Sequence, residues 1–136
     1  MISSIVSRLS AAFLCCLGLS LLFVPDVVLG ALTPGVRQTA EWIGQLLAAA
    51  WLGMASLNWM QRSVVIGGIY GRPLVSANVV LYMVSALSMT RVASTPGATW
   101  AAVALTVPLC LFAAAYAALL FRGPFDSLPT GTVQVE

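Results

Sequence analysis

One stretch of the chain, from Asn58 to Asn78, gathers residue types that could bind an anion. Glycine leaves backbone amides unshielded, and arginine adds a planar cation that suits phosphate. Amides and a guanidinium at the start of a helix can together hold a lipid phosphate. The predicted anion or lipid-headgroup site consists of Gly67, Gly68, Tyr70, Gly71 and Arg72. The alternative is a tight structural turn that places the arginine at the headgroups.

A second set of polar residues lies inside apolar surroundings. Asn78, Tyr82 and Ser85 follow one another at intervals of four and three residues, so they form one stripe on a helix. In lipid this stripe should face the protein interior, where polar groups can find partners. It either makes hydrogen bonds between helices or forms the wall of a small polar cavity. The residues assigned to this candidate cavity are Gln45, Asn58, Asn78, Tyr82 and Ser85.

The residues needed for catalysis are scattered or missing. There is no histidine, and the acidic residues do not form a pair that could act as acid and base. Three cysteines lie inside apolar runs without a CxxC motif, which indicates reduced packing residues. Glu41, four residues after Arg37, predicts an interfacial ion pair, with a proton-linked role as the alternative. We therefore expect no enzyme, no metal site and no cofactor.

The composition indicates a chain that is dissolved in lipid. Of 136 residues, 60% are hydrophobic and 7% charged, far below the roughly one quarter typical of soluble domains. Four apolar runs are each long enough to cross a bilayer. They predict one all-α membrane domain, a transmembrane four-helix bundle. Its helices are expected at about 9–30, 40–60, 74–91 and 98–121, followed by a tail at 123–136.

The ends of these helices carry the usual signals. The first apolar run could also be a secretory signal peptide, although its removal would leave an odd number of helices. Trp42 and Trp59 lie seventeen residues apart, about 25 Å along a helix, and could mark opposite headgroup layers. The small pairs Gly44/Ala48 and Ala49/Gly53 indicate a face for close helix packing. The 61–72 linker either lies along the interface or re-enters the protein.

Arginine placement predicts the orientation. Arg8, Arg62, Arg72 and Arg122 fall on one side of a four-helix arrangement, and Arg37 and Arg91 fall on the other. Cytoplasmic flanks carry the excess of basic residues, so both termini are expected in the cytoplasm. A net charge of +2 from scattered arginines does not indicate nucleic-acid binding.

A resemblance to a known family rests on the central stretch. Gly-Gly-Ile-Tyr-Gly-Arg-Pro at 67–73, with Asn58 and Trp59 before it and Asn78 after it, resembles small uncharacterised DoxX-like membrane proteins of bacteria. The helix number and the proline after the first helix are also similar. The resemblance implies four helices and a multi-pass location in the bacterial inner (cytoplasmic) membrane. It implies no particular activity.

The sequence has helix faces suited to close packing but no grouped catalytic residues, which favours a non-enzymatic role. We expect an accessory or packing subunit of a larger membrane assembly, with membrane lipids and other membrane subunits as partners. The alternative is a small carrier or binding protein for a lipid or apolar metabolite, with the polar stripe lining a cavity near a kink at Pro108. Ion conduction is less favoured, because no ring of charges or run of exposed carbonyls is present.

Overall fold

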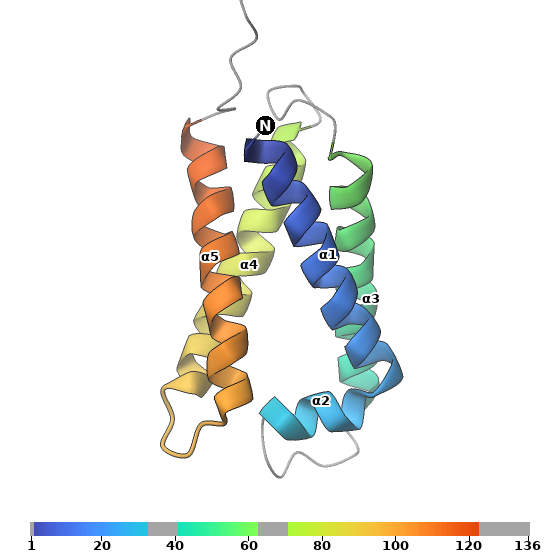
Figure 1. Ribbon diagram of the computed structural model, residues 1–136, viewed down its shortest axis with the longest axis vertical. Coiled ribbons are helices and arrows are strands. Elements are labelled where there is room, and N and C mark those ends of the chain that lie inside the picture. The colour runs from blue at the N-terminus through green and yellow to red at the C-terminus, as the bar shows by residue number, and fades with distance from the viewer. Residues whose placement is uncertain (1, 33–40, 63–70, 123–136) are drawn as a thin grey trace, which may run out of the picture.

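The computed structural model describes residues 2–32, 41–62 and 71–122 (Figure 1). These residues form helices and their connecting turns, with no strand among them. The helices are α1 (Ile2–Phe23), α2 (Pro25–Leu32), α3 (Glu41–Met60), α4 (Gly71–Ala93) and α5 (Trp100–Arg122). The all-helical fold expected from the composition is therefore confirmed. The predicted tail at 123–136 lies outside the described residues.

The helix expected at about 9–30 is divided in the structure into α1 and α2, at the proline that the sequence also marks as an end or a bend. Proline has no backbone N–H, and its ring clashes with the carbonyl four residues earlier, so a straight helix cannot continue through Pro25. The same residue fits the first position of α2, where no donor is needed. The break is short, because helical hydrogen bonds continue on both sides of it. The Val24 amide donates to the Ser20 carbonyl at 3.0 Å, and the Val28 amide donates to the Val24 carbonyl at 3.1 Å. Helix α1 also begins earlier than predicted, at Ile2.

Three helices in the described part of the chain are long and apolar enough to cross a membrane. They are Ser3–Phe23 in α1, Gly71–Ala93 in α4 and Trp100–Phe121 in α5. Helix α3 has 20 residues, but it includes Glu41, Gln45 and Asn58 and falls short of the same hydropathy. The eight residues of α2 span only about 12 Å, too little for a crossing.

The long helices associate in two pairs (Figure 1). Helix α1 packs along α3 and α4 packs along α5, while α2 lies across one end of the molecule. Small residues allow the close approach of α1 and α3. A Cβ added at Gly18 would lie 2.8 Å from Leu52 Cγ and 3.3 Å from the Ala48 carbonyl oxygen. Gly44 and Ala48 are buried in this contact, which confirms the first small-residue pair, whereas Ala49 and Gly53 face outward.

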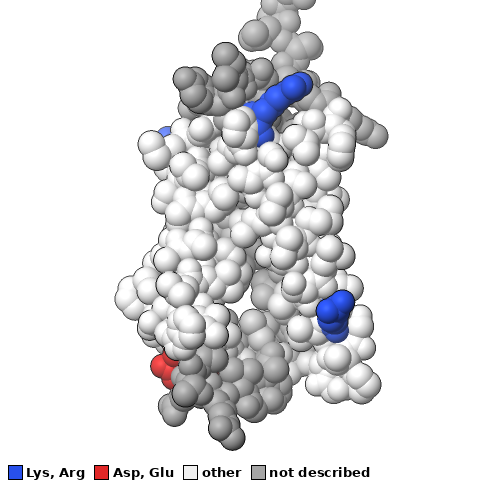
Figure 2. Space-filling model, turned by 180° about the vertical axis from the view of Figure 1, so that it is seen from behind, with Lys and Arg blue, Asp and Glu red and all other residues white. Residues whose placement is uncertain are grey.

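The two ends of the molecule differ in charge. The start of α1, the end of α3, the start of α4 and the end of α5 lie at one end, which we call the arginine end (Figure 1). The charged side chains that the structure describes there are Arg8, Arg62 and Arg72. At the opposite end, the α2 end, the charged residues within the described part of the chain are Asp26, Glu41 and Arg91. On the face drawn in Figure 2, coloured charged atoms lie towards the two ends and the band between them is white.

Candidate functional site

Four fully buried polar side chains meet between the two helix pairs. Ser10 comes from α1, Asn58 from α3, and Asn78 and Tyr82 from α4, each with 0% of its surface exposed. We call this group the asparagine cluster. Asn78 lies seven residues after the start of α4, so the cluster sits about 10 Å below the arginine end. Because these side chains are fully buried, each of their polar groups needs a hydrogen-bond partner within the protein.

The two asparagines bind each other reciprocally. Asn58 Nδ2 donates to Asn78 Oδ1 at 2.9 Å, and Asn78 Nδ2 donates to Asn58 Oδ1 at 2.7 Å. Each amide nitrogen has a second hydrogen to donate. Asn58 Nδ2 also donates to Ser10 Oγ, and Asn78 Nδ2 also donates to the Leu74 carbonyl, both at 2.9 Å. All four amide hydrogens are therefore used. These side chains hold helices together and offer no free donor to a ligand.

Aromatic rings join α5 to the cluster. The Tyr82 hydroxyl lies 2.7 Å from Ser10 Oγ, and its ring stacks on Phe112 and Tyr116 of α5 at centroid distances of 5.0 and 5.6 Å. Phe112 also contacts Phe13 of α1, at 5.3 Å. The cluster and its rings therefore connect all four long helices. Because hydrogen bonds and ring stacking both require defined geometry, they fix how the two pairs meet.

The Tyr116 hydroxyl lies near the Ser7 and Ser10 hydroxyls but makes no well-formed hydrogen bond to either. Among the described residues it is the one buried side-chain polar atom without a hydrogen-bond partner. Only 1% of Tyr116 is exposed, and its ring packs on Tyr82. A buried hydroxyl without a well-formed hydrogen bond costs free energy that the ring contacts must offset.

The predicted polar cavity is only partly assembled. Asn58, Asn78 and Tyr82 come together as described, but their polar groups are bonded within the cluster, and none of the three lines the two hollows described below. Gln45 is exposed on the outer face of α3 and takes no part. Ser85 is half-buried and lines a different space, described below. Sequence reasoning missed Ser10, although the buried serines of α1, Ser3, Ser7 and Ser10, repeat the same four-and-three spacing that identified the stripe on α4.

The predicted anion site is described only in part. Gly71 is buried at the start of α4 and Arg72 beside it is exposed, whereas Gly67, Gly68 and Tyr70 lie outside the described residues. At the end of α3, Arg62 donates to the Trp59 carbonyl at 2.7 Å and stacks over the Trp59 ring at 4.4 Å. This arginine is therefore held against α3 by a hydrogen bond and a cation–π contact.

A cavity of about 370 Å³ separates the two helix pairs towards the α2 end. We call it the inter-pair cavity. Residues from all five helices line it, and two serines of α4 are its polar side chains. The lining residues are Leu17, Leu21, Val28, Leu29, Leu32, Leu47, Trp51, Val84, Ser85, Ser88, Met89, Val92, Leu105 and Leu109. Its size falls within the range of small-molecule sites, and its surface suits an apolar chain.

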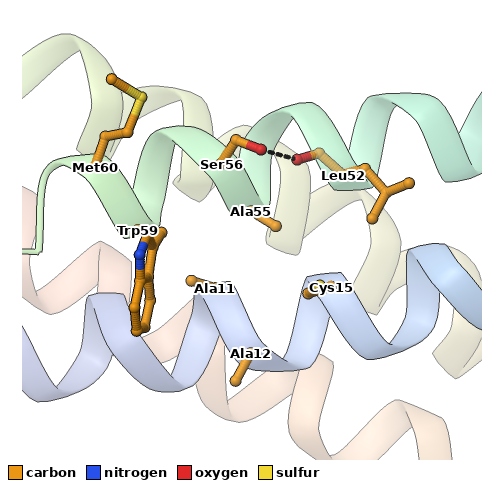
Figure 3. A pocket seen from close by; sticks show the side chains of 8 residues that line it. All are labelled: Ala11, Ala12, Cys15, Leu52, Ala55, Ser56, Trp59 and Met60. Atoms are coloured by element: carbon orange, nitrogen blue, oxygen red, sulfur yellow. Dashed lines mark hydrogen bonds between the residues drawn. The ribbon is translucent and has the colours of Figure 1, made fainter.

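A second hollow, the α1–α3 groove, has a volume of about 410 Å³ (Figure 3). Small side chains leave its middle open, and Trp59 closes one side of it. The Ser56 hydroxyl donates to the Leu52 carbonyl at 2.9 Å and so offers little polarity to the groove. The lining residues are Ala11, Ala12, Cys15, Leu52, Ala55, Ser56, Trp59 and Met60.

Reactive groups do not gather in the part of the chain that the structure describes. No group of three potential metal ligands is found there, and the three cysteines are free. Neither a protein-family model, nor a curated protein, nor a solved structure matches the chain. Its function must therefore be inferred from the chemistry of the cluster, the cavity and the groove.

Proposed function

We propose that the chain is a four-helix transmembrane bundle of the bacterial inner membrane, with α3 as the fourth crossing and both termini in the cytoplasm. Helix α3 packs along α1, and its terminal Trp42 and Trp59 are 61% and 53% exposed, as expected of side chains at the headgroups. The arginine end carries only positive charge among its described residues, which favours the cytoplasmic side. The resemblance to DoxX-like proteins remains a prediction.

Within that membrane the protein acts as a non-enzymatic accessory subunit of a larger assembly. The observation that supports this proposal is the α1–α3 groove, which is open on the outside while the polar side chains of the cluster are used inside. In lipid, helices associate by close van der Waals packing, and small side chains permit it. A transmembrane helix of a partner subunit fits the groove, because Ala11, Ala12 and Ala55 let its backbone approach.

Purification with a matched pair of variants tests this proposal. The tagged protein is extracted in mild detergent, and stoichiometric partners are identified by mass spectrometry. Ala12→Phe fills the groove, whereas Ala114→Phe adds the same bulk to an exposed position of α5 outside it. We expect a defined partner that is lost from Ala12→Phe and kept by Ala114→Phe. A homogeneous monomer without a partner contradicts the proposal, as does a partner retained by Ala12→Phe.

A second candidate function is the binding of a lipid or an apolar metabolite. It no longer rests on Asn78 and Tyr82, which are bonded within the cluster. It rests on the inter-pair cavity, whose lining is apolar except for Ser85 and Ser88. Trp51 lies in this lining, so an apolar quencher that enters the cavity should lower its fluorescence. Quenching that a cavity-filling variant such as Ser85→Phe abolishes would support this function.

A further inference from the structure

We infer that the inter-pair cavity selects a neutral ligand with an apolar body and one hydroxyl or carbonyl group, which Ser85 and Ser88 bind. This ligand class and these two recognition residues extend the second function proposed above, on which the inference rests. Both serines belong to α4 and line the cavity. They give an otherwise apolar space one polar position.

The hydroxyls of Ser85 and Ser88 make no hydrogen bond within the described part of the chain. In a helix a serine hydroxyl can donate to the carbonyl four residues earlier, as those of Ser20 and Ser56 do at 2.8 and 2.9 Å. Ser76 makes no such bond either, but it is exposed and lines neither hollow. Ser85 and Ser88 differ because they line a cavity, so a ligand there can bond to their hydroxyls.

The spacing of the two serines allows them to bind one oxygen atom together. Residues three apart on a helix are neighbours on one face, with Cβ atoms about 5–6 Å apart. A ligand oxygen between them can lie at hydrogen-bond distance from both hydroxyls, about 2.7–2.8 Å from each. A serine hydroxyl both donates and accepts, so the pair can bind a carbonyl, which only accepts, or a hydroxyl, which does both.

The rest of the lining determines the body of the ligand. The other described lining residues are apolar and come from all five helices. On α4 the lining runs from Val84 to Val92, about 12 Å of helix, and both serines lie within that length. An apolar chain in the cavity therefore packs against leucine side chains such as Leu21 and Leu109 while its oxygen lies at the serines.

This lining disfavours two other classes of ligand. A hydrocarbon that excludes water from the cavity leaves both serine hydroxyls without a partner. A charged group at the serines meets no opposite charge, because none of the described lining residues is charged. An unpaired charge in apolar surroundings costs far more free energy than a missing hydrogen bond. A long-chain alcohol or ketone belongs to the class that satisfies both conditions.

Three quenchers of equal chain length test the inference in lipid nanodiscs: bromodecane, ω-bromodecanol and ω-bromodecanesulfonate. They share the chain and the bromine atom, and they carry no polar group, a neutral one or a permanent charge. Trp42, Trp59 and Trp100 are replaced by phenylalanine, which leaves Trp51 in the cavity as the emitter. A second protein that keeps only Trp100, which is 83% exposed, measures how much of each quencher has dissolved in the bilayer.

Three variants of the Trp51 protein separate recognition by the serines from binding in the cavity. The double variant Ser85→Ala/Ser88→Ala removes both hydroxyls and keeps the cavity open, whereas Ser85→Phe fills it. Ser20→Ala is the matched control, because it removes an exposed hydroxyl of α1 outside the lining.

After correction for bilayer content, ω-bromodecanol should bind about three- to tenfold more tightly than bromodecane, the range of one net hydrogen bond. The sulfonate should quench Trp51 least. The alanine double variant should lose the preference for the alcohol and still be quenched by bromodecane, and Ser20→Ala should keep the preference.

Equal binding of the alcohol and the hydrocarbon, unchanged in the alanine double variant, overturns recognition by Ser85 and Ser88 and leaves apolar binding in the cavity standing. Quenching by the sulfonate as strong as that by the alcohol overturns the neutral ligand class. Quenching of Trp51 that Ser85→Phe does not reduce overturns the second proposed function as well.

Discussion

Removing both asparagines of the cluster should lower the free energy of unfolding by less than the sum of the two single removals. Asn58→Leu leaves the Asn78 amide without its reciprocal partner in a dry interior, and it also takes a donor from Ser10. We expect each single leucine variant to lower the free energy of unfolding by about 1–2 kcal/mol. The double variant Asn58→Leu/Asn78→Leu should lose less than the sum of the two. Reversible unfolding in bicelles measures all four species, and additive losses would show that the two amides do not act as a pair.

The two buried tyrosines should respond oppositely to loss of the hydroxyl. Tyr82→Phe removes the contact with Ser10 and should lower stability by about 1 kcal/mol. Tyr116→Phe keeps the stacked ring and removes a hydroxyl without a partner, so it should be neutral or slightly stabilising. The same unfolding measurement compares them. A loss in Tyr116→Phe as large as that in Tyr82→Phe would mean that the Tyr116 hydroxyl has a partner in the membrane.

Side-chain spacing revealed half of the cluster. Asn78 and Tyr82 could be placed on an inward face because their interval follows the helical repeat within one segment. Their hydrogen-bond partners lie on other helices. The spacing of residues along α4 does not reveal which residues of α1 and α3 they contact. Ser10 was missed for this reason, and Gln45 was grouped with Asn58 although it faces outward. A side-chain amide in an apolar sequence suggests a buried hydrogen bond. A glutamine near a helix end, however, can reach the headgroup region and needs no partner within the protein.

At the scale of the helix, the α1–α3 contact should be sensitive to a single methyl group. Gly18→Ala places a Cβ against Leu52 Cγ and near the Ala48 carbonyl, so α1 must move away from α3. We expect a loss of about 1–3 kcal/mol in unfolding free energy, typical of overpacking. The matched control is Gly53→Ala, which meets no atom within 4 Å. It should gain up to about 1 kcal/mol from helix propensity. Equal effects of the two substitutions would refute close packing at Gly18.

Helix boundaries could be predicted where residues that disfavour or end a helix occur in the sequence. The three later helices lie within three residues of their expected ends, because glycine, proline and arginine mark those positions. The first region was placed less well: Pro25 marks an end or a bend in the sequence, but the expected bounds of 9–30 ran across it, and α1 begins at Ile2. Gly97 lies in the turn between α4 and α5 with a φ of +86°, a backbone conformation that suits glycine.

The orientation of the whole molecule can be tested by labelling from one side. In a variant without the native cysteines, Ser94→Cys marks the α2 end and Gln61→Cys marks the arginine end. In intact bacterial cells whose outer membrane is permeabilised, an impermeant maleimide should label Ser94→Cys and spare Gln61→Cys. Lysis should make both reactive. Labelling of Gln61→Cys alone before lysis would contradict the proposed topology, because either an inverted bundle or an α3 that does not cross gives this result. Labelling of both would show that α4, which joins the two positions, does not cross.

The uneven connection between the helix pairs has a mechanical consequence. Near the arginine end, directional bonds and stacked rings tie the pairs together; near the α2 end, about 370 Å³ separates them. The helix pairs should therefore move little relative to each other near the cluster, and more near the inter-pair cavity. Lateral pressure in the leaflet at the α2 end should therefore change the cross-section of the protein more than pressure in the opposite leaflet. Spin-label distances between α3 and α5 should accordingly broaden from the arginine end to the α2 end.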